Sequence, residues 1–167
     1  MCYFVTVAVQ PNKESALAHL REAGLSLHPS GNRQLAAAFP AGHRLFEVTL
    51  GGCSCGLYAA AIGGPTEEEV RTKYKKKGWS RARVERAIES KRRTGRMGDG
   101  TPLFKAFMQA VSATVADAKR FFLFAHSYTA GTDAESFGML PSLVFSLDGF
   151  LQGGGVYPED TIAEVRA

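Results

Sequence analysis

Short runs of β-branched and aromatic residues predict strands near both ends of the chain. Residues 2–9 (CYFVTVAV) are apolar on both faces, which is typical of a central strand. Similar runs follow at residues 44–50, 121–125 and 143–147, and a last short strand or helix is expected from residue 161. These runs predict a sheet whose strands come from the two ends of the sequence.

Residues 34–39 are also expected to form a strand. The sequence PAGH at 40–43 is a turn signal that separates this segment from the strand at 44–50. The two segments are therefore expected to pair as a hairpin. Residues 25–32, which precede them, are expected to form a loop.

Apolar residues repeat with the helical period in two further segments. Residues 13–23 carry an apolar face, with Asn12 before them as the N-cap and Gly24 after them as the end. Residues 102–118 carry a wider apolar face and begin with a threonine cap followed by proline at the first helical position. The wider face predicts that the second helix is the more deeply buried one.

Residues 66–95 are predicted to form two helices joined by a tight turn. The first helix begins with a capping box, the pattern T-x-x-E at 66–69. Gly78 stands where a left-handed residue ends a helix, an arrangement that brings Trp79 against Tyr74 in a Schellman cap. The serine after this tryptophan is a good N-cap for the second helix, so one indole is expected to close both helices.

The order of these elements favours an α+β fold. Strands come first, then helices, then strands again, which predicts a mixed or antiparallel sheet packed by about three to four helices, with a basic helical hairpin at 66–95. The chain has 167 residues, 45% of them hydrophobic, which is enough for one core. We find no internal repeat and no interdomain linker, so residues 1–167 are expected to form a single domain.

Positive charge is concentrated in residues 65–98. The segment holds 12 of the 20 Lys and Arg and five of the 16 Asp and Glu, whereas the whole chain has a net charge of only +4. Such a local excess favours an acidic partner. Three interpretations stay open: a solvated face without a partner, a surface for an acidic protein, and nucleic acid bound by residues 66–96. The candidate partner-binding residues are Lys73, Lys76, Lys77, Trp79, Arg81, Arg92 and Arg93.

A second candidate site is the glycine-flanked sequence Cys53-Ser54-Cys55. Either cysteine, paired with His126 at the end of an apolar strand, would supply the nucleophile and base of a cysteine-dependent enzyme. A metal site formed by these cysteines and a histidine is another alternative, although the second pair common at zinc sites is absent. A third is that both are small, buried thiols. Removal of Met1 would expose Cys2, as in N-terminal nucleophile hydrolases, but a cysteine within a strand fits better.

The sequence contains no phosphate loop, dinucleotide-binding fingerprint, paired metal ligands or recognisable triad. It also shows no signal peptide and no apolar run long enough to cross a membrane. Three cysteines without a disulfide framework fit a reducing cytoplasm. We therefore expect a non-enzymatic cytosolic binding protein without a cofactor or metal. An immunity or antitoxin protein that neutralises a protein toxin is one such function.

Overall fold

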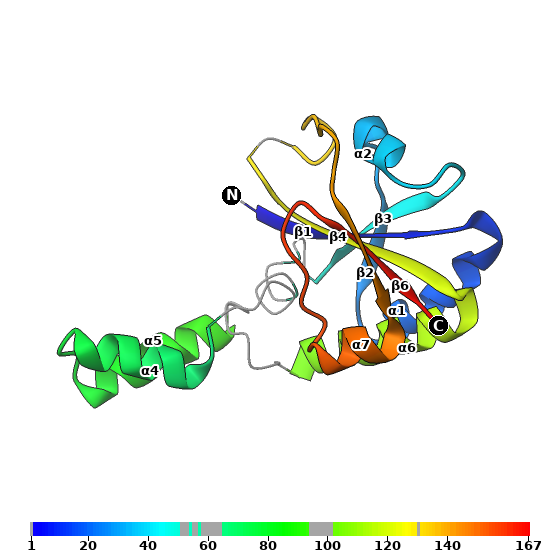
Figure 1. The fold of residues 1–167 in the computed structure, drawn as a ribbon. Helices are drawn as coiled ribbons and strands as arrows, with labels where there is room; N and C mark the ends of the chain where they lie inside the picture. The colour runs from blue at the N-terminus through cyan, green and yellow to red at the C-terminus, as the bar shows by residue number, and fades with distance from the viewer. Residues whose placement is uncertain (1, 51–53, 55–56, 58–64, 94–101, 130) are drawn as a thin grey trace.

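The computed structural model describes the whole chain except residues 1, 51–53, 55–56, 58–64, 94–101 and 130. Its centre is one six-stranded sheet with the order β2-β3-β1-β4-β6-β5 (Figure 1). All neighbouring strands are antiparallel except β5 and β6, which are parallel, so the sheet is mixed. The strands are β1 (Cys2–Val9), β2 (Ser26–Pro29), β3 (Arg44–Thr49), β4 (Arg120–Tyr128), β5 (Ser142–Ser146) and β6 (Ile162–Arg166).

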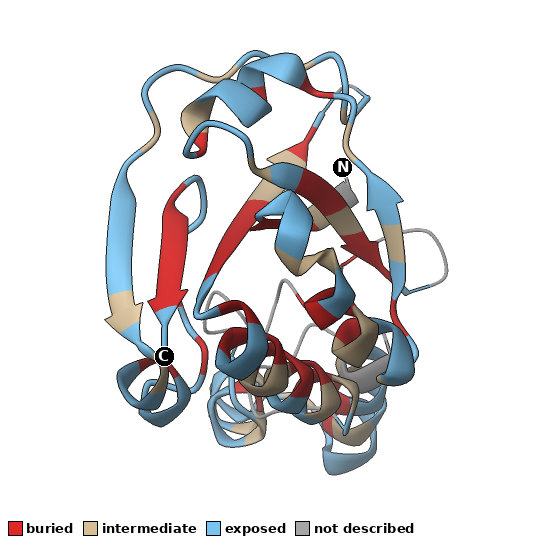
Figure 2. Ribbon diagram, turned by 90° about the vertical axis from the view of Figure 1, so that its right-hand side faces the viewer, coloured by how far each residue is buried: buried red, intermediate tan, exposed pale blue. Residues whose placement is uncertain are grey.

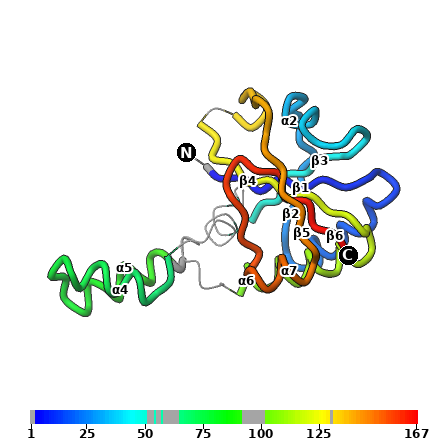
Figure 3. The backbone as a smooth tube through the Cα atoms, viewed as in Figure 1, coloured from blue at the N-terminus to red at the C-terminus, as the bar shows by residue number. Residues whose placement is uncertain are grey.

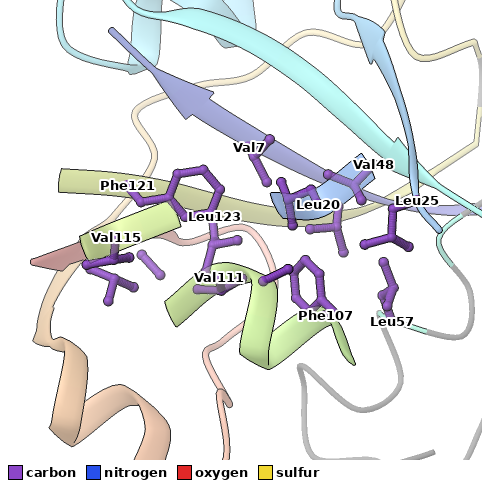
Figure 4. Close-up of a cluster of buried hydrophobic side chains, with 14 of the residues drawn as sticks. Val7, Leu20, Leu25, Val48, Leu57, Phe107, Val111, Val115, Phe121 and Leu123 are labelled. Carbon is purple, nitrogen blue, oxygen red and sulfur yellow. The ribbon is translucent and has the colours of Figure 1, made fainter. Parts of the chain in front are cut away.

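The main hydrophobic core lies on one face of the sheet, under a layer of helices. This layer consists of the 3-10 helix η1 (Pro11–Leu17), α1 (Ala18–Glu22), α6 (Pro102–Ala118) and α7 (Leu147–Gln152). Figure 4 shows Phe107 and Val111 of α6 reaching towards Val7 and Leu123 of the central strands. The long apolar face of α6 explains its central place in this core, as predicted.

A smaller core covers the opposite face, beneath α2 (Arg33–Ala38). Along β4, Phe121 and Leu123 belong to the main core, whereas Phe122 and Phe124 belong to the smaller one. Burial on both faces explains why this strand is a nearly continuous apolar run. The edge of the sheet is different: β5 is largely exposed beside the buried strand β6, which ends near the C-terminus (Figure 2).

Two further helices, α4 (Glu67–Lys76) and α5 (Arg81–Arg93), form a hairpin that projects away from the sheet (Figures 1 and 3). The hairpin has its own small core of Val70, Val84 and Ile88. The structure thus confirms the α+β fold and the basic helical hairpin.

The prediction for residues 25–39 is wrong in two respects. Residues 34–38 belong to α2 and Phe39 is its C-cap, so this segment is not a strand. The Asn32 side chain accepts a hydrogen bond from Leu35 N at 2.8 Å and caps a run of strong helix formers. The expected loop at 25–32 contains β2, which pairs with β3. The sequence pattern does not predict β2, because an edge strand with mostly exposed positions needs few apolar residues.

Three smaller predictions are also corrected. The helix expected at 13–23 begins earlier, as η1, and Gln10 rather than Asn12 occupies its N-cap position. Strand β4 continues to Tyr128, so His126 lies within the strand and not at its end. Helix α7 was not predicted, and it begins where the Ser146 side chain accepts a hydrogen bond from Gly149 N at 3.1 Å.

Candidate functional sites

The turn between α4 and α5 has the predicted Schellman geometry. Gly78 has φ +70°, the left-handed conformation that favours glycine. Trp79 N donates to the Tyr74 carbonyl at 3.1 Å, and Gly78 N donates to the Lys75 carbonyl at 3.0 Å. These two bonds satisfy carbonyls that the end of a helix leaves free. The turn is therefore fixed by local hydrogen bonds.

Trp79 supports this turn with both faces of its indole. The Tyr74 ring is stacked on it with centroids 4.2 Å apart and planes 5° apart. The Arg83 guanidinium carbon lies 4.0 Å from the same indole centroid. Two groups this close to one ring must occupy opposite faces. Trp79 also packs against the hairpin core, so its first role is structural.

The hairpin uses several of its carboxylates internally. Thr66 and Glu69 form the predicted capping box, in which Glu69 Oε2 accepts from Thr66 N at 2.8 Å. Arg71 links the two helices, since it donates to Glu67 Oε1 at 3.0 Å and to Glu85 Oε2 at 2.9 Å. The acids that hold the hairpin together are therefore not available to neutralise its other cations.

Five cations remain exposed towards the far end of the hairpin. Within the described part of the chain, none of them pairs with a carboxylate. They are Lys73, Lys75, Lys76, Lys77 and Arg81. In Figure 1 the hairpin extends away from the sheet, and the turn at 77–80 between its two helices lies at the far end, which is the distal tip. Of the predicted contact residues, Arg92 and Arg93 have side chains outside the described set.

A shallow groove lies beside this tip. It is lined by Trp79, Val84, Arg71, Lys75 and Arg81, and of these three cations Arg71 is already bound by Glu67 and Glu85. The groove therefore combines apolar lining residues with two exposed cations, Lys75 and Arg81.

A second site surrounds His126 on the face of the sheet that α2 covers. The register of β1 and β4 places this histidine opposite Phe4. Its ring lies 4.5 Å from that of Tyr128 and 5.0 Å from that of Phe137, with both pairs edge to face. The imidazole side chain is only 15% exposed. Aromatic walls therefore hold the ring in one orientation.

Carboxylates bind both nitrogens of this ring. His126 Nε2 lies 2.6 Å from Glu135 Oε2, and Nδ1 lies 2.5 Å from Asp160 Oδ1. Burial lowers the pKa of His126, but the hydrogen bonds to the two carboxylates raise it more, so the net pKa lies above its ordinary value. Glu135 itself accepts from Thr129 Oγ1 at 2.8 Å.

Backbone hydrogen bonds place two acids next to His126. Asp160 N donates to the carbonyl of Ala125 at 3.1 Å, and Ser127 N donates to Glu159 Oε1 at 3.1 Å. The two acids are thus tied to the residues on either side of His126. One ligand atom each from His126, Glu159 and Asp160 lies within 4.8 Å of the others, a spacing that would suit one metal ion.

The loop that carries Glu135 is attached to the start of α2. The buried Asn32 side chain donates to the Thr132 carbonyl at 2.9 Å and to the Glu135 carbonyl at 3.0 Å. Asp133 Oδ1 accepts from Gly31 N at 3.1 Å. The same asparagine therefore caps a helix and positions the loop beside His126.

The cysteine site is described only at its central residue. Val5 and Val48 face each other on β1 and β3, and the Ser54 hydroxyl lies between their backbones. It accepts from Val5 N at 2.9 Å and donates to the Val48 carbonyl. Cys53 and Cys55 lie outside the described residues, so their pairing with His126 stays a prediction.

No family model matches the chain, and neither a curated protein nor a solved structure does. Within the described residues, no helix has both the length and the apolar character needed to cross a membrane.

Proposed function

We propose that the protein binds an acidic protein partner through the distal end of the α4–α5 hairpin. The observation that carries the proposal is the group of five exposed cations without carboxylate partners in the described structure, at the end of a projecting hairpin. Charges placed this way attract an oppositely charged surface over several ångströms and speed its encounter. An immunity or antitoxin role is one form of this proposal.

The groove beside the tip favours a protein over a nucleic acid. Its apolar lining residues Trp79 and Val84 suit an apolar side chain, whose acidic neighbours would lie at Lys75 and Arg81. Single-stranded nucleic acid is often held by bases stacked on aromatic rings. Tyr74 and Arg83 already occupy both faces of Trp79, so this indole has no face left for a base.

The hairpin does not need these cations for its own fold. Its turn is held by backbone hydrogen bonds, and its helices are joined by three buried apolar residues and by Arg71. Exposed ion pairs add little stability in any case. Charge at the tip can therefore be changed without unfolding the hairpin, which makes the proposal testable by mutation.

Defined probes test the proposal. The probes are a glutamate-rich peptide with one central leucine, the same peptide with alanine in place of leucine, and a short DNA duplex. We expect the leucine peptide to bind tightest, and the triple variant Lys73→Glu, Lys76→Glu, Arg81→Glu to lose that binding. Tighter binding of the duplex, with a steep dependence on salt, would instead indicate a nucleic-acid partner.

A matched control reverses three exposed charges on the body of the protein: Arg21→Glu, Arg33→Glu and Lys105→Glu. It changes the net charge by the same amount but leaves the hairpin intact. The proposal requires this control to bind the peptide like the wild type. Equal loss in both variants would mean that only net charge matters and that the tip is not a binding site.

A further inference from the structure

His126, Glu159 and Asp160 offer one nitrogen and two carboxylate oxygens at a single point on the surface. Their ligand atoms all lie within 4.8 Å of one another. We propose that these three residues bind one divalent transition-metal ion, with Zn²⁺ as the best fit. His126 belongs to β4, so the site lies at the sheet and not on the α4–α5 hairpin, and it is independent of the function proposed for that hairpin.

Strand pairing places the three ligands. Asp160 N bonds to the Ala125 carbonyl, which extends the contact between β4 and the chain entering β6. Ser127 N bonds to Glu159, on the other side of His126. Hydrogen bonds to the backbone of β4 therefore hold both acids next to the histidine.

The second nitrogen of His126 has the partner expected of a zinc-binding imidazole. In zinc sites the ring nitrogen that does not bind metal usually donates to a carboxylate, which fixes the ring and its tautomer. Here Nε2 lies 2.6 Å from Glu135 Oε2, while Nδ1 points at Asp160. Thr129 and the aromatic walls hold this arrangement in place. Nδ1 is therefore the nitrogen assigned to the metal.

The charges around the ring also favour a cation. Three carboxylates, from Glu135, Glu159 and Asp160, surround one imidazole. Within the described residues, neither Glu159 nor Asp160 forms an ion pair with a lysine or arginine. A protonated His126 can balance at most one of the two charges of Glu159 and Asp160, and a divalent ion would compensate for both.

The donor set selects the class of ion. Imidazole suits zinc and its neighbours in the transition series, whereas magnesium and calcium prefer oxygen ligands alone. Three protein ligands leave the fourth position of a tetrahedral zinc site open to water. The site therefore has the ligand number of zinc sites that keep an exchangeable position.

Calorimetric titration of the full, chelator-treated chain with zinc chloride tests the assignment. We expect one zinc per chain and at least tenfold weaker binding in each of His126→Asn, Glu159→Gln and Asp160→Asn. The matched controls His28→Asn and Glu89→Gln, at exposed positions elsewhere, should bind like the wild type. Zinc binding of wild-type affinity in all three site variants would overturn the proposal. Tighter binding of calcium than of zinc by the wild-type protein would overturn it as well.

A second measurement needs no variant. In ¹⁵N NMR spectra of the wild-type protein, zinc should shift the Nδ1 resonance of His126 and leave that of His28 unchanged. A shift confined to His126 supports the site even if a variant fails to fold. Absence of that shift at saturating zinc would refute it.

Discussion

Tyr74 and Trp79 stack across the turn of the α4–α5 hairpin, with ring centroids 4.2 Å apart and planes only 5° apart. The Schellman hydrogen bond from Trp79 N to the Tyr74 carbonyl joins the same two residues through their backbones. Side-chain and backbone contacts thus coincide at one place. This pair keeps the two helices together far from the sheet, and it determines where the exposed cations stand.

Trp79→Ala should destabilise the hairpin without unfolding the sheet. Removal of large buried aromatics costs roughly 3–5 kcal/mol, and we expect about 2–3 kcal/mol here because the indole is only half-buried. Hydrogen exchange should show faster exchange in α4 and α5 and unchanged protection in β1 and β4. Trp79→Phe, which keeps an aromatic ring against Tyr74, should destabilise the hairpin less than Trp79→Ala does. Uniform loss of protection across the sheet would contradict this local role.

Ser54→Ala should destabilise the sheet. The hydroxyl bridges Val5 N and the Val48 carbonyl, and its removal leaves both groups buried without that partner. An unsatisfied buried polar group costs about 1–3 kcal/mol, so we expect a loss of about 2–4 kcal/mol in urea denaturation. Ser136→Ala, at an exposed position, is the control and should change stability little. Equal stability of the two variants would show that the bridge is dispensable.

Acid should weaken the fold through Glu164. The hydrogen bond from Arg166 is the largest cause that lowers the pKa of Glu164, and the hydrogen bond from Arg120 lowers it further. The pKa of Glu164 is therefore about 2, compared with an ordinary value of 4.5. The carboxylate therefore stabilises the folded state above about pH 4.5, and this contribution is lost as the pH falls towards 2. Glu164→Gln should flatten the stability profile over this range. An identical profile in wild type and variant would exclude this residue as the cause.

Gly155→Ala should lower the free energy of unfolding by more than the change of backbone preference alone would. Gly155 has φ +70°, and an added Cβ would overlap the Met108 side chain of α6. Gly24→Ala is the matched control, because its φ is +82° and nothing lies near the new methyl group. We expect the control to lose about 1–2 kcal/mol and Gly155→Ala to lose about 2–4 kcal/mol once overpacking is added. Equal losses would mean that Met108 moves aside freely.

The parts of the fold that depend on neighbouring residues were predictable from the sequence. Thr66, Gly78 and Trp79 lie within one turn of the helix ends that they fix, so the α4–α5 hairpin follows from local rules. Residues 34–39 show the limit of such rules. A short apolar run suits either a strand or a helix, and the Asn32 cap decides for the helix.

The site around His126 could not be derived in this way. Asp160 lies 34 positions from His126 in the sequence, and only the pairing of β4 with β6 brings the two together. The sequence did single out His126, because polar residues follow an apolar strand there. It gave no signal that Glu159 and Asp160 were its neighbours, and it directed attention to Cys53 and Cys55 instead.

The rate of association measures the central claim most directly. The glutamate-rich peptide with its central leucine is mixed with wild type, with the tip variant Lys73→Glu, Lys76→Glu, Arg81→Glu, and with the body control, over a range of salt concentrations. We predict that the association rate constant of the tip variant falls about tenfold or more at low salt, with a smaller change in dissociation. Raised salt should bring the wild type towards the same value. A tip variant that associates as fast as the wild type would contradict binding through the end of the hairpin.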